Sequence, residues 1–227
     1  MNNYKQQAAT EAFKLISKGQ VIGLGAGSTI AYLVKTIAAD HALASTLTFS
    51  SPSYDTVIML NDHRLNVKPS DFLQGVDLYF DGCDQLDWQL NALKSGGGIH
   101  TYEKILAVMA DEFVLLGDYG KLVEHLDVTY PLVIEVLPQA LNVVSAILRK
   151  QFKGISLIIR TGDQRVGPVR TDGGCYLIDA SFVTLPGLEL LDQIKMIPGV
   201  VDHSLFFKLA DKAILAGPEG IRTITQK

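Results

Sequence analysis

Cysteine is scarce in this chain, since only Cys83 and Cys175 occur among its 227 residues. Two thiols this far apart are too few for a disulfide framework and lack the spacing of a zinc site. Four of the five histidines also show no metal-ligand spacing. We therefore expect no metal site and a reduced, cytoplasmic setting.

Long apolar runs and basic runs are also missing. No uninterrupted apolar stretch approaches the roughly 18 residues of a membrane span, and the N-terminus has no apolar core of a signal peptide. Lys and Arg total 20 against 24 Asp and Glu, with no basic run of five or more. We expect neither a membrane nor a nucleic acid as partner. The 48% hydrophobic and 19% charged content is typical of a globular protein with a large core.

Strand and helix patterns alternate in the first half of the chain. Helical spacing of apolar residues covers 9–16 and 30–37, and short apolar strands are predicted at 21–24, 47–49, 76–80, 105–110 and 113–116. This alternation predicts an α/β fold, a Rossmann-like, mostly parallel sheet with helices on both faces. In such sheets ligands bind beyond the carboxyl ends of the strands.

The pattern changes near residue 130. Strands are predicted at 132–136, 156–160, 175–178 and 200–205, helices at 139–151 and 188–194, and a polar turn at 161–167. This βαββαβ order predicts a small ferredoxin-like α+β domain. A last strand and hairpin at 212–224 return to the first domain. We therefore predict one domain from 1–128 plus 206–227 and a second from 129–205.

A glycine loop follows the first predicted strand and precedes a helix. It reads Gly25, Ala26, Gly27, Ser28 and Thr29. The spacing G-x-G-x-x-G is not met and no Gly-Lys-Ser/Thr follows, which excludes a dinucleotide fingerprint and a P-loop. Ser28 or Thr29 can cap the helix, and plain capping is one interpretation. We favour a single phosphate, because exposed N–H groups and the helix dipole attract an anion.

Acids, a lysine and glycines gather within residues 81–103. Asp81 and Asp84 follow a predicted strand, Lys94 opens the run KSGGG, and Glu103 comes next. Any one piece is also typical of a solvated turn, a glycine loop or a helix start. Together they suit proton transfer on an anionic small molecule.

These motifs resemble the ribose-5-phosphate isomerase family, type A. The matching blocks are VIGLGAGST (21–29), DGCDQLD (81–87), KSGGG (94–98), Glu103-Lys104, GKLV (120–123), LPG (185–187), IPGV (197–200) and LFFKLADKAILAG (205–217). They occur in family order over nearly the whole chain. The resemblance implies interconversion of ribose 5-phosphate and ribulose 5-phosphate through an enediol, without metal or cofactor. It also implies a homodimer or homotetramer.

The resemblance also implies roles for individual residues. Glu103 would be the base, Asp81 would assist ring opening, and Asp84 would hold sugar hydroxyls. Lys94, with the N–H groups of 95–98, would stabilise the enediolate, and Lys121 would bind phosphate with Ser28, Thr29 and, more weakly, Lys5. The predicted substrate contacts are Gly25, Ala26, Gly27, Ser28, Thr29, Asp81, Gly82, Cys83, Asp84, Lys94, Ser95, Gly96, Gly97 and Lys121.

The chain departs from the family pattern at several positions, and two alternatives stay open. The departures are Ala26, Cys83, Gln85, Trp88, Ser95, His100 and Tyr102, of which Cys83 is mild because a free cysteine packs as a small hydrophobe. An isomerase or deaminase for another sugar phosphate is one alternative, although a histidine-centred ring-opening apparatus is not identified. A non-catalytic sugar-phosphate sensor is the other, although all the acids proposed for chemistry are retained.

Overall fold

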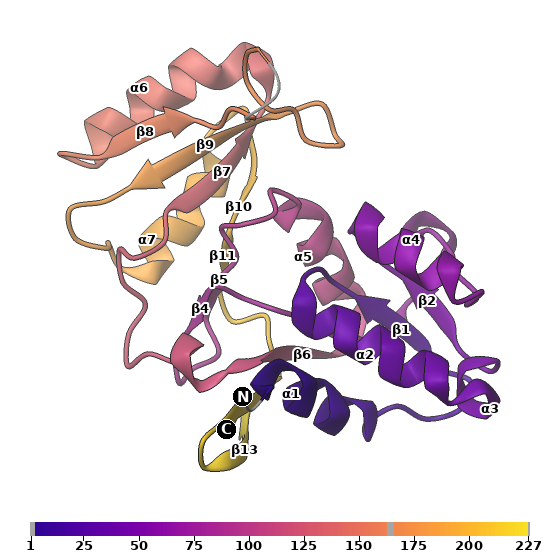
Figure 1. Cartoon of the computed structure of the whole chain (residues 1–227). Helices are drawn as coiled ribbons and strands as arrows, with labels where there is room; N and C mark the ends of the chain where they lie inside the picture. Colours follow the sequence, from indigo (N-terminus) through magenta and orange to yellow (C-terminus); the bar gives the residue numbers. More distant parts are fainter. Residues whose placement is uncertain (1–2, 163–165, 227) are drawn as a thin grey trace.

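The computed structural model describes residues 3–162 and 166–226 and contains a large, mostly parallel sheet (Figure 1). Its order is β13-β12-β6-β3-β1-β2. The strands are β1 (Val21–Leu24), β2 (Thr48–Ser50), β3 (Val76–Asp81), β6 (Ala110–Asp118), β12 (Lys212–Gly217) and β13 (Gly220–Thr225). Only the β12–β13 hairpin pairs antiparallel within this sheet as described. The predicted fold class and the predicted return of the last hairpin are confirmed.

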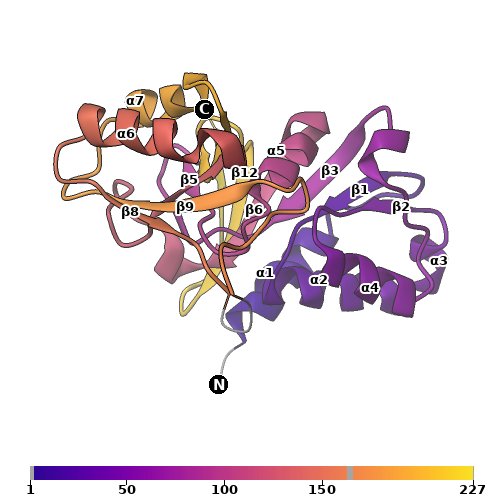
Figure 2. The same ribbon diagram turned by 90° about the horizontal axis from the view of Figure 1, so that it is seen from above.

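Helices cover both faces of this sheet because its strands are apolar on both sides. Phe80 and Val114 share a core with α1 (Tyr4–Phe13), α2 (Ser28–Ala39) and α4 (Tyr54–Asp62), while α3 (His41–Ala44) follows α2. Tyr79 and Phe113 point to the other face, where their rings stack at 4.9 Å and share a core with Leu106 of α5 (His100–Met109). Figure 2 shows both helical layers from above.

The prediction of a strand at 105–110 is wrong. Residues up to Met109 belong to α5, and β6 begins at Ala110. Leu106 and Ala107 are buried, whereas Ile105 is 41% and Val108 67% exposed, which is the burial pattern of a helix. The exposed apolar residues complete a continuous apolar run, and such a run does not distinguish a strand from a helix.

A second sheet, with the order β10-β7-β9-β8, lies above the first in Figure 1. Its strands β7 (Leu132–Val136), β8 (Ser156–Ile159), β9 (Tyr176–Ser181) and β10 (Val200–His203) pair antiparallel. The helices α6 (Leu141–Gln151) and α7 (Leu188–Asp192) pack on it. The βαββαβ order is thus observed, and the domain boundaries stay a prediction. Part of the predicted turn 161–167 lies outside the described residues.

A small third sheet, which the sequence pattern does not predict, joins the two parts. It consists of β4 (Gln85–Leu86), β5 (Ala92–Leu93) and β11 (Leu205–Phe206). Because β11 pairs with β5, the strand predicted at 200–205 ends at His203. None of the helices in the described ranges combines the length and apolar character that a bilayer crossing requires.

The large sheet reverses its strand order next to β1. The chain runs from β1 outward to β2 and then crosses back to β3 on the other side of β1. Connections that leave in opposite directions open a crevice at the carboxyl ends of the two central strands. The loop from Gly25 to Thr29 follows β1, and Asp81 ends β3, so the topology brings both predicted motifs to this crevice.

Candidate active site

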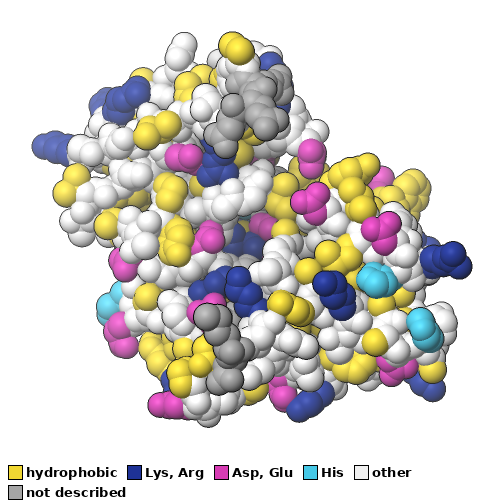
Figure 3. Space-filling view, in the orientation of Figure 1, with side chains coloured by type: hydrophobic (Ala, Val, Ile, Leu, Met, Phe, Trp, Pro, Cys, Tyr) yellow, Lys and Arg dark blue, Asp and Glu magenta, His cyan; other side chains and the backbone are white. Residues whose placement is uncertain are grey.

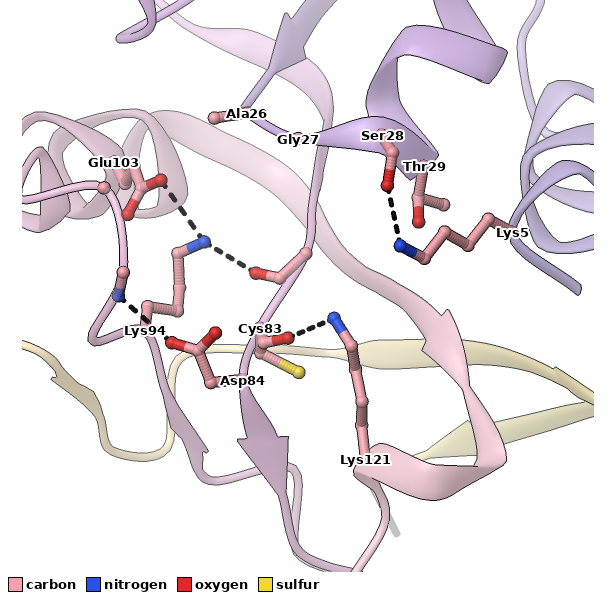
Figure 4. Close-up of a pocket in the computed structure, with 13 residues that line it drawn as sticks. Lys5, Ala26, Gly27, Ser28, Thr29, Cys83, Asp84, Lys94, Glu103 and Lys121 are labelled. Carbon is pink, nitrogen blue, oxygen red and sulfur yellow. Dashed lines mark hydrogen bonds and ion pairs between the residues drawn. The ribbon is translucent and has the colours of Figure 1, made fainter. Parts of the chain in front are cut away.

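A cavity of about 300 Å³ lies at this crevice (Figure 4). Figure 3 shows Lys, Arg, Asp and Glu side chains together in the hollow between the two larger parts of the molecule. The lining residues are Lys5, Ala26, Gly27, Ser28, Thr29, Gly82, Cys83, Asp84, Lys94, Gly96, Gly97, Glu103 and Lys121. Three predicted contacts, Gly25, Asp81 and Ser95, are not among them.

Gly25 lies under the carboxylate of Asp81. A Cβ atom at Gly25 would lie 2.0 Å from Oδ1 of Asp81, so only glycine allows this approach. The next backbone N–H, of Ala26, donates to the same Oδ1 over 3.2 Å. The hydroxyl of Thr56 on α4 donates to the carbonyl of Gly25 at 2.8 Å and holds the loop from behind. The glycine loop thus serves Asp81 as well as the cavity.

The N-terminus of α2 opens into the cavity without a side-chain cap. Gly27 is the N-cap residue, with φ at 95°, and Ser28 is already helical, so plain capping by Ser28 or Thr29 is not observed. Nζ of Lys5 donates to Oγ of Ser28 at 2.9 Å, and Lys121 lies across the cavity with its Nζ on the carbonyl of Cys83. Uncapped N–H groups and two ammonium groups together favour the binding of an anion.

Three charged groups meet at the buried end of the cavity. Nζ of Lys94 lies 2.8 Å from Oδ2 of Asp81 and 3.3 Å from Oε1 of Glu103. It also donates to the carbonyl of Gly82 at 2.6 Å (Figure 4). Asp81 is fully buried, Glu103 is 5% exposed and Lys94 is 8% exposed. The shorter distance makes Asp81 the ion-pair partner of Lys94, with Glu103 as a second neighbour.

This arrangement shifts the pKa values of Glu103 and Lys94 in ways that give the two groups different tasks. Burial raises the pKa of Glu103 to about 8, the charge of Asp81 adds to this, and Lys94 opposes it. Burial alone would lower the pKa of Lys94, but the charges of Asp81 and Glu103 outweigh it and hold that pKa above its ordinary value. Lys94 therefore stays charged, while Glu103 exchanges its proton near neutral pH, as a general base requires.

Tyr79 supports the buried end and was not predicted from the sequence. Its hydroxyl donates to Oδ2 of Asp81, and the N–H of Gly82 donates to Oδ1 at 2.7 Å. Burial, with the nearby charges of Asp81 and Glu103, raises the pKa of Tyr79, which keeps the phenol protonated. The signal was available, because Tyr79 and Asp81 are two residues apart on a strand and share a face.

Asp84 is held by the loop after Lys94. Its Oδ2 accepts from the N–H of Ser95 at 2.6 Å and from the N–H of Gly96 at 3.2 Å. The predicted direction of these two N–H groups, toward the substrate, therefore differs from the structure. The Ser95 hydroxyl donates to the carbonyl of Pro131 at 2.6 Å, away from the cavity. The N–H groups of Ser95 and Gly96 are thus used by Asp84, although Gly96 and Gly97 both line the cavity.

Most departures from the family pattern lie outside the cavity lining. Gln85 exchanges two hydrogen bonds with Asp127, and Trp88 lies against Arg222. His100 is fully buried on α5, and burial lowers its pKa to about 3. Of the seven departures only Ala26 and Cys83 line the cavity. Within the described ranges no three His, Cys, Asp or Glu residues are grouped to hold a metal ion.

Comparison with known proteins identifies the family. The model of the ribose 5-phosphate isomerase A (phosphoriboisomerase A) family matches residues 48–220. Ribose-5-phosphate isomerase A of Methanocaldococcus jannaschii is 36% identical over 222 residues, which cover 97% of this chain and 96% of the relative. The Pyrococcus horikoshii protein of the same name is 34% identical, with the same coverage.

Two solved structures match over nearly their whole length. That of the M. jannaschii enzyme has a TM-score of 0.90 at 35% identity and covers 98% of both chains. A D-ribose-5-phosphate isomerase in complex with phospho-erythronic acid has a TM-score of 0.92 at 33% identity, covering 99% of this chain and 100% of the other. This chain therefore belongs to the ribose 5-phosphate isomerase A family.

Proposed function

We propose that this chain interconverts D-ribose 5-phosphate and D-ribulose 5-phosphate. One observation carries the proposal: a buried base beside a buried ammonium lies at one end of a cavity whose other end is an anion site. Glu103 and Lys94 supply the first pair, and the N-terminus of α2 with Lys5 and Lys121 supplies the second. A phosphorylated sugar has its anion at one end and its reacting carbons at the other.

The geometry suits a proton transfer between neighbouring carbons. Glu103, as a carboxylate, removes the proton from C2 of the open aldose, and the electron pair of that C–H bond forms the C1–C2 double bond. The carbonyl at C1 becomes an oxyanion, and the fixed charge of Lys94 stabilises it. The C2 hydroxyl proton passes to the oxyanion at O1, and return of the proton from Glu103 to C1, as the carbonyl forms at C2, gives the ketose.

Other groups have supporting roles in this proposal. Asp81 keeps Lys94 charged and raises the pKa of Glu103 from behind the cavity wall. The ring-opening role predicted for Asp81 stays a prediction. Asp84 lines the cavity and receives both loop N–H groups on Oδ2, which leaves Oδ1 to hold a sugar hydroxyl. Lys5, Ser28, Thr29 and Lys121 bind the phosphate.

The setting and assembly of the enzyme are also proposals. Cys83 and Cys175 are both buried free thiols, which fits the reducing cytoplasm. A homodimer or homotetramer stays the prediction for the oligomeric state. A sensor that only binds the sugar phosphate has no need of a base whose pKa is raised to about 8.

The test is ketose formation from ribose 5-phosphate by the purified protein, with a chelator present. We expect turnover by the wild type and a loss of about 100-fold or more in kcat for Glu103→Gln, because a general base is removed. Glu124→Gln, which changes an exposed carboxylate, is the matched control. No turnover by a folded wild type that binds the substrate would contradict the proposal. Turnover that survives Glu103→Gln would remove Glu103 as the base.

A further inference from the structure

Arg160, at the edge of the second sheet, holds the loop that follows Lys94. Arg160 lies directly after β8, its Nη2 donates to the carbonyl of Ser95 and its Nη1 to that of Gly96, both at 2.8 Å. Asp179 on β9 binds the guanidinium from another side, with Oδ1 2.6 Å from Nη2 and 3.1 Å from Nε. The guanidinium thus lies between a fixed carboxylate and two carbonyls of the active-site loop.

These contacts decide where the loop N–H groups point. A trans peptide group is planar, so its carbonyl and its N–H face opposite ways, and the chain has no cis peptide among its described residues. The carbonyl of Ser95 faces Arg160, and the N–H of the same peptide group, on Gly96, donates to Asp84. The carbonyl of Gly96 also faces Arg160, so the N–H of Gly97 points away from Arg160, and Gly97 lines the cavity.

Glycines give this loop no stiffness of its own. Gly96 and Gly97 are exposed and have no side chain to restrict their backbone. An arginine suits the task because its planar fork reaches two carbonyls at once, whereas a lysine acts as a point charge. A cation at the carbonyl also polarises the peptide group, which strengthens its N–H as a donor.

We propose that Arg160 is a positioning residue, which fixes two peptide groups so that one N–H holds Asp84 and the next faces the substrate oxyanion. This inference rests on the proposed function, because the oxyanion is that of the enediolate. Arg160 does not line the cavity and acts through the loop. Its loss should therefore weaken the binding of an enediolate-like acid while leaving the phosphate end intact.

The test compares two probes on purified wild type and Arg160→Ala. Phospho-erythronic acid, the compound bound in the related structure, carries both a carboxylate and a phosphate, and inorganic phosphate occupies the phosphate end alone. We expect Arg160→Ala to bind the acid about tenfold more weakly, as loss of one well-placed charged hydrogen bond predicts, with phosphate affinity changed less than about twofold. kcat for ribose 5-phosphate should fall about tenfold, and Arg160→Lys should restore part of both losses.

Arg170→Ala is the matched control, at an arginine that forms an isolated bridge with Tyr176 of β9. Arg170 donates to the carbonyl of Gly174 at 2.9 Å and lies over the ring of Tyr176, away from the active-site loop. We expect it to bind both probes as the wild type does. Equal loss of both probes in Arg160→Ala, or equal loss of the acid in Arg170→Ala, would overturn the proposal.

A second variant covers a failure of Arg160→Ala to fold. Asp179→Asn keeps the guanidinium and removes the charge that orients it, so the same selective loss is expected at a smaller size. Wild-type affinity for the acid in a folded Asp179→Asn and in Arg160→Lys would overturn the proposal. A wild type that binds the acid but forms no ketose would contradict the proposed isomerase alone, because the binding comparison still decides the role of Arg160.

Discussion

Both ends of the cavity contain charged groups, but in very different surroundings. At the buried end Asp81, Lys94 and Glu103 are each at most 8% exposed, and their charges act on one another with little water between them. At the open end Lys5 and Ser28 are exposed and Lys121 is half-buried. Burial raises the pKa of Glu103 to about 8, whereas water screens the charges of the open end.

This contrast indicates how the fold divides the work. The buried end is assembled from β3, from the loop after β5 and from α5, and its chemistry depends on that tertiary arrangement. The open end comes mostly from one continuous segment, β1, the glycine loop and the start of α2. Changes at the buried end should therefore alter kcat, stability and pH dependence, whereas changes at the open end should alter affinity.

Replacing Lys94 should give the largest effect. Lys94→Met leaves the carboxylate of Asp81 buried without its cation, which costs about 3 kcal/mol in the free energy of unfolding. kcat for ribose 5-phosphate should fall about 100-fold or more, because the oxyanion loses its fixed charge. Chemical denaturation and steady-state kinetics measure the two effects.

A surface lysine in a comparable ion pair gives the control. Nζ of Lys14 lies 2.6 Å from Glu11, but the Lys14 side chain is 64% exposed. Lys14→Met should cost no more than about 0.5 kcal/mol and leave kcat unchanged. Equal losses of stability in the two variants would contradict the view that burial distinguishes the two ends.

The pH profile should show the buried end alone. In the proposed reaction Glu103 acts as a carboxylate, so kcat/KM should rise with pH and level off above the pKa of Glu103 in the free enzyme, about 8. Competitive inhibition by inorganic phosphate should show no inflection there, because the open end has no group tied to Glu103. A kcat/KM profile already flat above pH 6 would show that Glu103 has an ordinary pKa.

The same shift makes stability depend on pH. Because the folded pKa of Glu103 lies above the ordinary value of 4.5, its contribution is fully present below about pH 4.5 and is lost as pH rises through about 8. Glu103→Gln removes this dependence, so the melting temperature of the variant relative to the wild type should rise from about pH 4.5 to about pH 8 and level off above it. Glu124→Gln, at an exposed position, should follow the wild type throughout.

The two ends also differ in how far the sequence predicts them. The open end was predictable because strand, glycine loop and helix are consecutive, and only the N-cap residue, Gly27, was unexpected. For the buried end the sequence supplied Asp81, Lys94 and Glu103 as residue types. It supplied neither their distances nor the order of proton affinities, because desolvation depends on how three separate elements pack.

Contacts between distant segments were the least predictable part. Arg160 reaches the loop across 64 residues of sequence, and no local pattern marks an arginine at the end of a strand as its partner. The segment at 105–110 was predicted wrongly for the same reason, because its exposure depends on how α5 packs against distant parts of the chain. The exposed Ile105 and Val108 carry no local sign that they face solvent, so their apolar character indicated a buried strand.

The smallest expected effect tests the open end at Ala26. Ala26 lines the cavity next to the start of α2, at a position where the family pattern has threonine. Ala26→Thr adds a hydroxyl at the phosphate, and one net hydrogen bond should lower KM about threefold with kcat unchanged. Ala26→Val has the same shape without the hydroxyl and should leave KM equal or higher. If both variants change KM alike, space rather than a hydrogen bond governs this position, and a change in kcat by either would mean that the two ends are coupled through the loop that also holds Asp81.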